Sequence, residues 1–183
     1  MSIMNLAIPP GARPAGPDIP PEVLEAFTAA TVTTFLELTS TDVCLRMPPL
    51  LSATPTDSDV NATIDLRREP PGRLTCSFPQ NVLESLAQRY LPPGTSLTSE
   101  IVDDTAGEFT NVIAGQAKTM LKGTEYHYTI SPPIVNRGPA PMSVHNQCDY
   151  LLLIFDTHSG PFSVQFSLLT RHQDSRPTVK ATD

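Results

Sequence analysis

The feature that most constrains the fold of this 183-residue chain is a long stretch in which apolar and polar residues alternate with the period of an α-helix. Its apolar residues recur every three or four positions, at Val102, Ala106, Phe109, Ile113, Ala117 and Met120. An α-helix turns about 100° per residue, so this spacing places all of them on one narrow face. The pattern predicts a helix over residues 98–121 that buries this face in a core.

The polar positions of the same stretch lie nearly opposite the apolar face, at Asp104, Glu108, Asn111, Gly115 and Lys118. These five positions, called the outer stripe below, are expected to face solvent. The glycine is unusual there, because glycine inside a helix costs about 1 kcal/mol relative to alanine. Its presence indicates that another molecule approaches the helix closely at this point.

Glu108 and Asn111 form the pair in the outer stripe with the clearest chemistry. They are three residues apart, so their side chains project side by side from the helix. One is a fixed anion, and the other is an amide that donates and accepts hydrogen bonds without being a base. Together they suit holding a cation and orienting a water. An ordinary solvated face stays an alternative, since this composition gives roughly 0.3 chance matches to E-x-x-N.

Shorter patterns predict the other elements. Helical spacing after two prolines predicts a helix over residues 21–38. A short helix follows Pro79, with Asn81 as its N-cap and an apolar side made of Val82, Leu83, Leu86, Ala87, Tyr90 and Leu91. Strands are expected over residues 41–46, 60–66, 73–78, 125–130, 147–155 and 161–169, and those at 60–66 and 73–78 are expected to form a hairpin. This order predicts a single α+β domain with helices packed on a mostly antiparallel β-sheet.

Proline is concentrated near the start of the chain. The sequence has 20 prolines, about twice the usual share, and six of them fall within the first 21 residues. Residues 1–20 are therefore expected to form a flexible arm, residues 21–170 the folded domain, and residues 171–183 a polar tail. The first residues lack the basic and apolar segments of a secretory signal peptide, so the expected location is the cytoplasm.

The charge of the chain excludes some classes of partner. A net charge of −7 and an isoelectric point near 5.0 disfavour nucleic acid, because binding to phosphates requires an excess of basic residues. No apolar run approaches the roughly 20 residues that span a bilayer, so no membrane partner is expected.

Cysteine and histidine give no sign of a disulfide or a metal centre. Cys44, Cys76 and Cys148 are odd in number and far apart, so we expect reduced thiols within the core. His145 and Cys148 are three residues apart but have no second pair beside them. We therefore expect no metal site and no cofactor of the chain's own.

The longer string around Glu108 and Asn111 resembles the signature helix of the CheX/CheC chemotaxis phosphatase family. Residues 104–118 read DTAGEFTNVIAGQAK, and the family pattern is an acid, E-x-x-N, an aliphatic pair, a glycine and often A-K. Residues 72–79, GRLTCSFP, are similar to the strand before this helix, and residues 130–135, ISPPIV, to the strand after it. The resemblance covers roughly residues 21–169. A single E-x-x-N, where CheC-type members carry two, favours the CheX branch.

This resemblance implies a CheX/CheC-like fold and an enzyme that hydrolyses the aspartyl phosphate of a CheY-type response regulator. The regulator would bring the phosphoryl group, Mg²⁺ and a lysine. Asn111 would hold the attacking water, and Glu108 would pair with that lysine. Asp104, Gly115 and Lys118 would dock the partner, although Lys118 also suits a merely solubilising role. The family further implies a homodimer that exchanges edge strands, for which the apolar run at residues 150–155 is suited.

Two other functions share the fold. The first is a non-catalytic CheX-like module that binds a receiver domain, or another signalling partner, through the same helix face. The second is a structural relative of the flagellar-switch proteins, disfavoured by the lack of extra terminal domains in this sequence. The presence of both Glu108 and Asn111 favours the enzyme.

Overall fold

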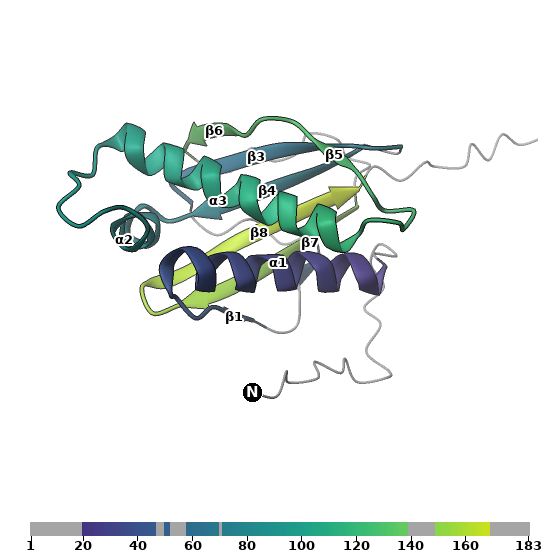
Figure 1. The fold of residues 1–183 in the computed structure, drawn as a ribbon, viewed down its shortest axis with the longest axis horizontal. Coiled ribbons are helices and arrows are strands. Elements are labelled where there is room, and N and C mark those ends of the chain that lie inside the picture. The colour runs from purple at the N-terminus through teal and green to yellow at the C-terminus, as the bar shows by residue number, and fades with distance from the viewer. Residues whose placement is uncertain (1–19, 47–49, 52–57, 70, 139–148, 169–183) are drawn as a thin grey trace, which may run out of the picture.

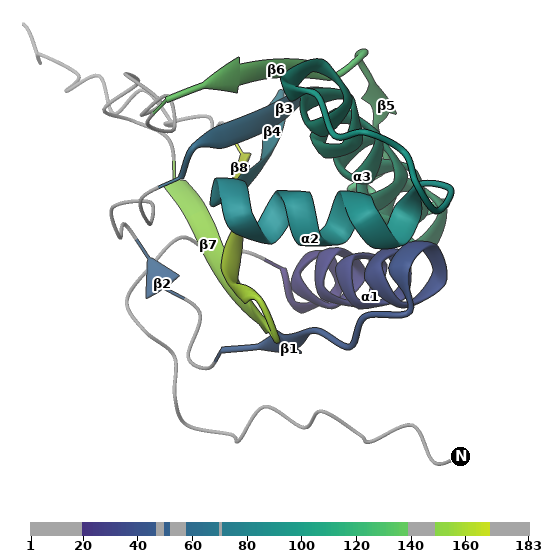
Figure 2. The same cartoon turned by 90° about the vertical axis from the view of Figure 1, so that its left-hand side faces the viewer.

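Eight strands form one antiparallel sheet, and three helices cover one of its faces (Figures 1 and 2). The computed structural model describes residues 20–46, 50–51, 58–69, 71–138 and 149–168. The helices are α1 (Pro21–Thr39), α2 (Gln80–Tyr90) and α3 (Ser99–Met120). The strands are β1 (Cys44–Leu45), β2 (Leu50–Leu51), β3 (Val60–Arg67), β4 (Gly72–Phe78), β5 (Thr129–Ile130), β6 (Ile134–Arg137), β7 (Asp149–Thr157) and β8 (Gly160–Leu168). The predicted α+β architecture is confirmed.

Two hairpins form the centre of the sheet. The strand order is β1-β7-β8-β4-β3-β5, with β2 also paired to β7 and β6 also paired to β3. The predicted hairpin of β3 and β4 is present, with Val60 opposite Phe78 and Leu66 opposite Gly72. Strands β7 and β8 form the second hairpin, and β4 and β8 join the two. Two hairpins of chain neighbours are thus joined in the middle by the long-range pairing of β4 with β8, and further long-range pairings add β1, β2, β5 and β6 at the edges.

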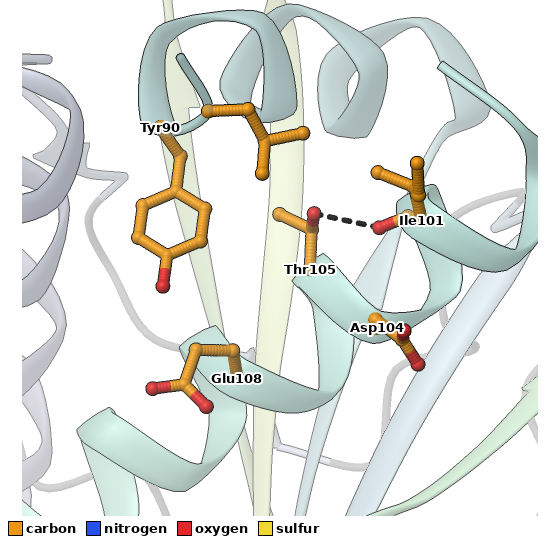
Figure 3. A pocket seen from close by; sticks show the side chains of 6 residues that line it. Tyr90, Ile101, Asp104, Thr105 and Glu108 are labelled. Atoms are coloured by element: carbon orange, nitrogen blue, oxygen red, sulfur yellow. Dashed lines mark hydrogen bonds between the residues drawn. The ribbon is translucent and has the colours of Figure 1, made fainter. Parts of the chain in front are cut away.

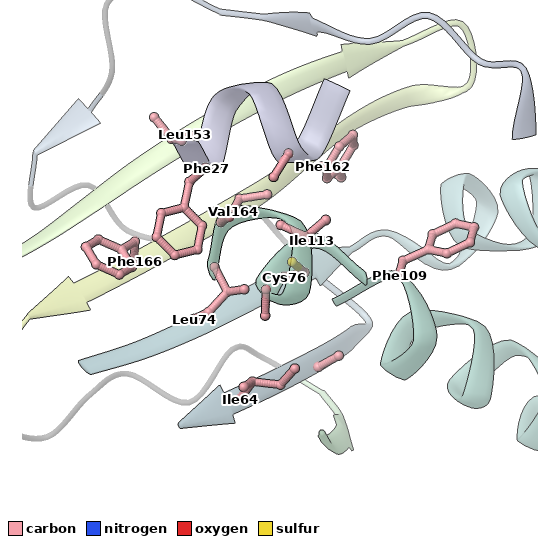
Figure 4. Packing of buried hydrophobic residues seen from close by; sticks show 14 of the residues in the cluster. Phe27, Ile64, Leu74, Cys76, Phe109, Ile113, Leu153, Phe162, Val164 and Phe166 are labelled. Atoms are coloured by element: carbon pink, nitrogen blue, oxygen red, sulfur yellow. The ribbon is translucent and has the colours of Figure 1, made fainter. Parts of the chain in front are cut away.

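The two faces of the sheet differ in chemistry, and this difference fixes where the helices lie. Leu74, Cys76 and Phe78 of β4 belong to the hydrophobic core, whereas Thr75 and Ser77 alternate with them on the other face. The register continues the apolar rows into β3 and β8, with residues such as Ile64, Val164 and Phe166 (Figure 4). Since only one face of these central strands is apolar, the helices pack on that face.

Helices α1 and α3 lie side by side along the sheet, and α2 crosses one end of the pair (Figures 1 and 2). Phe35 of α1 connects these layers. Its ring centroid lies 5.3 Å from that of Phe109 in α3 and 4.6 Å from that of Phe162 in β8. These aromatic contacts fix α3 through its buried face and leave the opposite face outward. None of the helices within the described residues has the length and apolar character needed to cross a membrane.

The strands at the sheet edges differ from the prediction. Strand β5 is only Thr129–Ile130, because the chain turns through residues 121–126 where a strand from residue 125 was expected. Strand β1 is likewise only two residues long. Strands β2 and β6 were not predicted; they follow prolines and are recognisable only from their pairing with β7 and β3. Nearly all of the predicted arm, and the whole predicted tail, lie outside the described residues.

The start of α2 is capped from outside the helix. The prediction that Asn81 is the N-cap is wrong: the helix begins at Gln80, and its Asn81 side chain donates instead to the Ser159 carbonyl at 3.2 Å. The Asp59 carboxylate accepts from the Gln80 backbone N–H at 2.7 Å. A carboxylate from the start of β3 thus takes the role that a local cap would have.

The cysteines separate into two environments. Cys76 is completely buried, as predicted, whereas Cys44 is exposed on the short strand β1, so the prediction of a core thiol there is wrong. Cys148 lies outside the described residues. Burial raises the pKa of the Cys76 thiol to about 12, and a hydrogen bond with Thr110 offsets part of this effect.

Alkylation of the native protein at pH 8 is expected to label Cys44 and to leave Cys76 unmodified. The raised pKa keeps Cys76 protonated, and only a thiolate is an effective nucleophile. Unfolded chains lose this proton near the ordinary value of 9.0, so the contribution of Cys76 to stability falls as pH rises from about 9 towards 12. Peptide mass spectrometry after iodoacetamide treatment measures the labelling. Modification of Cys76 without unfolding would contradict the expectation.

Candidate functional site

Helix α3 presents the two faces that its spacing predicts. Val102, Ala106, Phe109, Ile113 and Ala117 are all at most 1% exposed. Met120, predicted to share this face, is 47% exposed, so that part of the prediction is wrong. It is the last residue of the helix, and Leu121 after it, 2% exposed, occupies the core instead.

The outer stripe lies at the surface. Asp104 and Glu108 are exposed, while Asn111, Gly115 and Lys118 are half-buried. Within the described part of the chain, the Glu108 and Asn111 side chains take part in no hydrogen bond or ion pair. The two groups are therefore available to another molecule without first giving up an internal contact.

Neighbouring elements support the outer stripe from both sides. On the α1 side, Gln116 accepts from the Thr34 hydroxyl at 3.3 Å and donates to the Glu37 carboxylate at 3.1 Å. On the other side, Gly107 lies against Val135, and a Cβ at position 107 would be 3.4 Å from a Val135 methyl carbon. The absence of a side chain at Gly107 thus serves packing within the chain.

Gly115 differs from Gly107 in its surroundings. A Cβ added at position 115 would meet no atom within 4 Å. No contact with the described residues therefore requires a glycine here, and the bare backbone is open to another molecule.

Two further contacts hold α3 in place along its length. Near its start, Arg137 of β6 donates to the Asp103 carboxylate at 3.1 Å, to the Gln80 side chain at 3.1 Å and to the Ser99 carbonyl at 3.2 Å. Farther along, the Tyr128 hydroxyl donates to the Ala114 carbonyl at 2.9 Å. Burial raises the pKa of Tyr128 above its ordinary range, so this hydroxyl stays a neutral donor.

A groove of about 270 Å³ lies between the end of α2 and the first half of α3 (Figure 3). It is lined by Tyr90, Leu91, Ile101, Asp104, Thr105 and Glu108. Tyr90 was predicted on the apolar side of α2, yet it is 37% exposed. Its ring meets Phe109 edge-on, with centroids 5.5 Å apart. The sequence reasoning missed this residue; the signal available was its position in the last turn of a helix, where burial ends.

The other candidate positions do not add to this site. Arg68, in the turn between β3 and β4, has its guanidinium carbon 5.4 Å from the Tyr126 ring centroid and donates to the Glu125 carbonyl at 3.4 Å. The described residues hold no group of three or more histidine, cysteine or acidic residues that could bind a metal ion. His145 and Cys148 lie outside the described residues.

Comparison with known proteins places these features in a family. The family model described as chemotaxis phosphatase CheX matches residues 60–156, which is more than half of the chain and includes the whole outer stripe. The chain belongs to the CheX family. None of the curated proteins matches the sequence.

Solved structures of CheX proteins share the fold. CheX from Desulfovibrio desulfuricans is 21% identical over 80% of this chain and 99% of its own, with a TM-score of 0.72. CheX from Vibrio vulnificus is 19% identical over 80% and 98%, with a TM-score of 0.70. CheX from Borrelia burgdorferi, solved in a complex with CheY, BeF3 and Mg²⁺, is 15% identical over 81% and 98%, with a TM-score of 0.64. At these identities, the likeness supports the CheX/CheC-like fold.

Proposed function

We propose that this CheX family protein hydrolyses the aspartyl phosphate of a CheY-type response regulator. The observation that carries the proposal is the Glu108–Asn111 pair, side by side on the outward face of α3 and without an internal partner among the described residues. The family match over this helix supports it, as does the complex of the Borrelia burgdorferi protein with CheY.

The two side chains suit positioning better than acid–base chemistry. An aspartyl phosphate is already activated by the metal ion and lysine of its own protein, so a phosphatase has to place a water in line with the bond that breaks. The Asn111 amide can accept from that water through its oxygen and donate through its nitrogen. Glu108, one helical turn earlier, would form an ion pair with the regulator's lysine and so set the position of Asn111. Mg²⁺ would come with the partner.

The remaining residues of the outer stripe would dock the partner. Asp104 extends the acidic part of the stripe beyond Glu108, and Lys118 places a positive charge at its other end. Gly115, between Asn111 and Lys118, would let a loop of the regulator contact the helix backbone.

Gly115→Ala tests this role directly. Because the added methyl has open space, the variant is expected to be more stable by up to about 1 kcal/mol, since alanine is the better helix former. The same methyl would hold the partner away, and we expect the KM for a phosphorylated regulator to rise about fivefold. Thermal unfolding and steady-state phosphate release measure the two effects. A stabilised variant with an unchanged KM would remove Gly115 from the docking surface.

The proposed activity is tested by the loss of labelled phosphate from a phosphorylated receiver domain. We expect faster loss with repeated turnover when this protein is present at a tenth of the receiver concentration. Co-elution with the phosphorylated receiver, without faster hydrolysis, would instead favour a non-catalytic binding module. Homodimer formation and a cytoplasmic location stay predictions from the sequence.

A further inference from the structure

The groove between α2 and α3 combines an aromatic wall with acidic groups. Tyr90 contributes a partly exposed ring, and Leu91 and Ile101 contribute half-buried apolar surface. Asp104 and Glu108 are exposed and lie four residues apart on the helix. In Figure 3 the Glu108 side chain extends below the Tyr90 ring, whereas Asp104 lies beyond Thr105 with its carboxylate turned away from the ring. The Thr105 hydroxyl already donates to the Ile101 carbonyl at 2.8 Å. The groove therefore offers a ring face and hydrogen-bond acceptors, and none of its lining residues is basic.

Among the described residues, no basic side chain forms an ion pair with the carboxylates of the groove. The ion pairs among the described residues involve Asp156, Asp65 and Asp103, not Asp104 or Glu108. Lys118 lies ten residues after Glu108, which is about 15 Å along a helix axis and beyond the screening length of about 8 Å at physiological salt.

Two other charged groups flank the groove. Arg89, next to Tyr90, has its guanidinium 3.3 Å from the His158 ring nitrogen in the turn between β7 and β8. Glu100, exposed one turn before Asp104, adds a third carboxylate to the same side of α3. Three carboxylates therefore stand against one guanidinium around the groove, so a visiting cation would still meet net negative charge.

The shape of the groove favours one kind of cation. Its volume of about 270 Å³ is many times the roughly 30 Å³ share of one liquid water, so a whole side chain fits. The edge-on contact with Phe109 holds the Tyr90 ring in place, and Tyr90 stays 37% exposed. A guanidinium is planar, stacks on aromatic rings and pairs with a carboxylate through two hydrogen bonds, whereas an ammonium is compact and strongly hydrated.

We infer that this groove binds an arginine side chain of the receiver-domain partner, stacked on Tyr90, and that the exposed Asp104 side chain turns into the groove to pair with it. The identity of the partner rests on the proposed function; the preference for arginine rests on the groove. Glu108 lines the groove (Figure 3) and is also a member of the Glu108–Asn111 pair. The arginine would therefore lie about 6 Å along α3 from the lysine that pairs with Glu108, one helical turn away. Two ion pairs, arginine with Asp104 and lysine with Glu108, would fix the position of the partner along α3.

The preference of the groove is measurable without any partner protein. We would titrate the isotope-labelled full chain with Nα-acetyl-arginine amide and follow backbone amide signals by NMR. Saturable shifts are expected at Tyr90, Asp104 and Glu108, with a dissociation constant in the millimolar range and about fivefold weaker binding of Nα-acetyl-lysine amide. Neutral Nα-acetyl-citrulline amide should give no saturable shift. Equal responses to arginine and citrulline, or none at these amides, would overturn the inference.

Matched variants locate the binding. Tyr90→Leu keeps an apolar side chain but removes the ring, and Asp104→Asn keeps the size of the side chain but removes its charge. Each variant should weaken binding of the arginine derivative about threefold or more. Glu100→Gln, on the same helix but not among the lining residues of the groove, should have little effect on this binding. Equal losses in all three variants would show general charge attraction and contradict a specific groove.

The same variants connect the groove to the receiver. In the phosphate-release assay, Tyr90→Leu and Asp104→Asn should raise the KM about three- to tenfold with kcat within about twofold, the pattern of lost docking contacts. Rapid phosphate release together with no binding of the arginine derivative would defeat this inference alone. Arginine binding in the groove, with no phosphate release, would defeat the proposed function and retain the groove's ligand preference.

Discussion

Replacing Asn111 with alanine is expected to slow the loss of phosphate from a receiver domain by about 100-fold or more, with little change in the protein's stability. The expected decrease in rate is large because a misplaced water no longer attacks in line. Positioning errors of about 1 Å are enough to slow a reaction about 100-fold. The amide would act only while water attacks, so kcat should fall more than KM rises. Phosphate release under steady-state and single-turnover conditions separates the two.

The structure makes this variant informative, because the fold does not depend on the Asn111 side chain. It is half-buried and has no hydrogen-bond partner among the described residues, so truncation opens no core cavity. Alanine is also the better helix former, and the free energy of unfolding should stay within about 0.5 kcal/mol of the parent. Glu108→Ala is the comparison: it should mainly raise KM. Undiminished kcat in a folded Asn111→Ala protein would refute the proposed role.

Replacing Phe35 with alanine is expected to lower the free energy of unfolding by about 3–5 kcal/mol. Phe35 is fully buried, and its ring contacts Phe78, Phe109 and Phe162. The truncation would leave a cavity where α1, α3 and the sheet meet, and the neighbouring rings are held by separate elements, so they cannot close it. Urea unfolding followed by circular dichroism measures the loss.

Two further substitutions calibrate this result. Phe35→Leu refills most of the space and should cost clearly less than alanine. Leu36→Ala, at the next position on α1, removes a side chain that is 51% exposed and should change stability by about 0.5 kcal/mol or less. A loss below about 1 kcal/mol for Phe35→Ala would show that the aromatic cluster does not join the layers as described.

The residues of α3 show how far sequence reasoning reaches toward the site. The spacing of Val102, Phe109 and Ile113 sufficed to predict a buried face. All three lie inside a long helix, where the helical period alone decides in which direction a side chain projects. The outward placement of Glu108 and Asn111 followed from the same period. Met120 breaks the pattern because at a helix end the neighbouring elements, and not the period, decide burial.

Tyr90 and Asn81 show the same limit in α2. Apolar spacing placed Tyr90 with the core, but its neighbours across the groove come from α3, and they leave one part of the ring uncovered. Asn81 is a good capping residue by type, yet the helix start is capped by Asp59, the residue just before β3. In both cases, a contact between segments distant in sequence changed the role of a residue.

The sequence alone determined the elements with a strong internal period: α1, α3, the β3–β4 hairpin and the strands β7 and β8. It also determined the stripe of polar residues on α3. Only the tertiary structure decided the two-residue strands, the pairing of β6 with β3, the exposure of Cys44 and the groove beside Tyr90. The physical reason is that hydrophobic periodicity is a local property of the sequence. Strand pairing at a sheet edge and burial at a helix end depend instead on which segment, distant in sequence, packs against them.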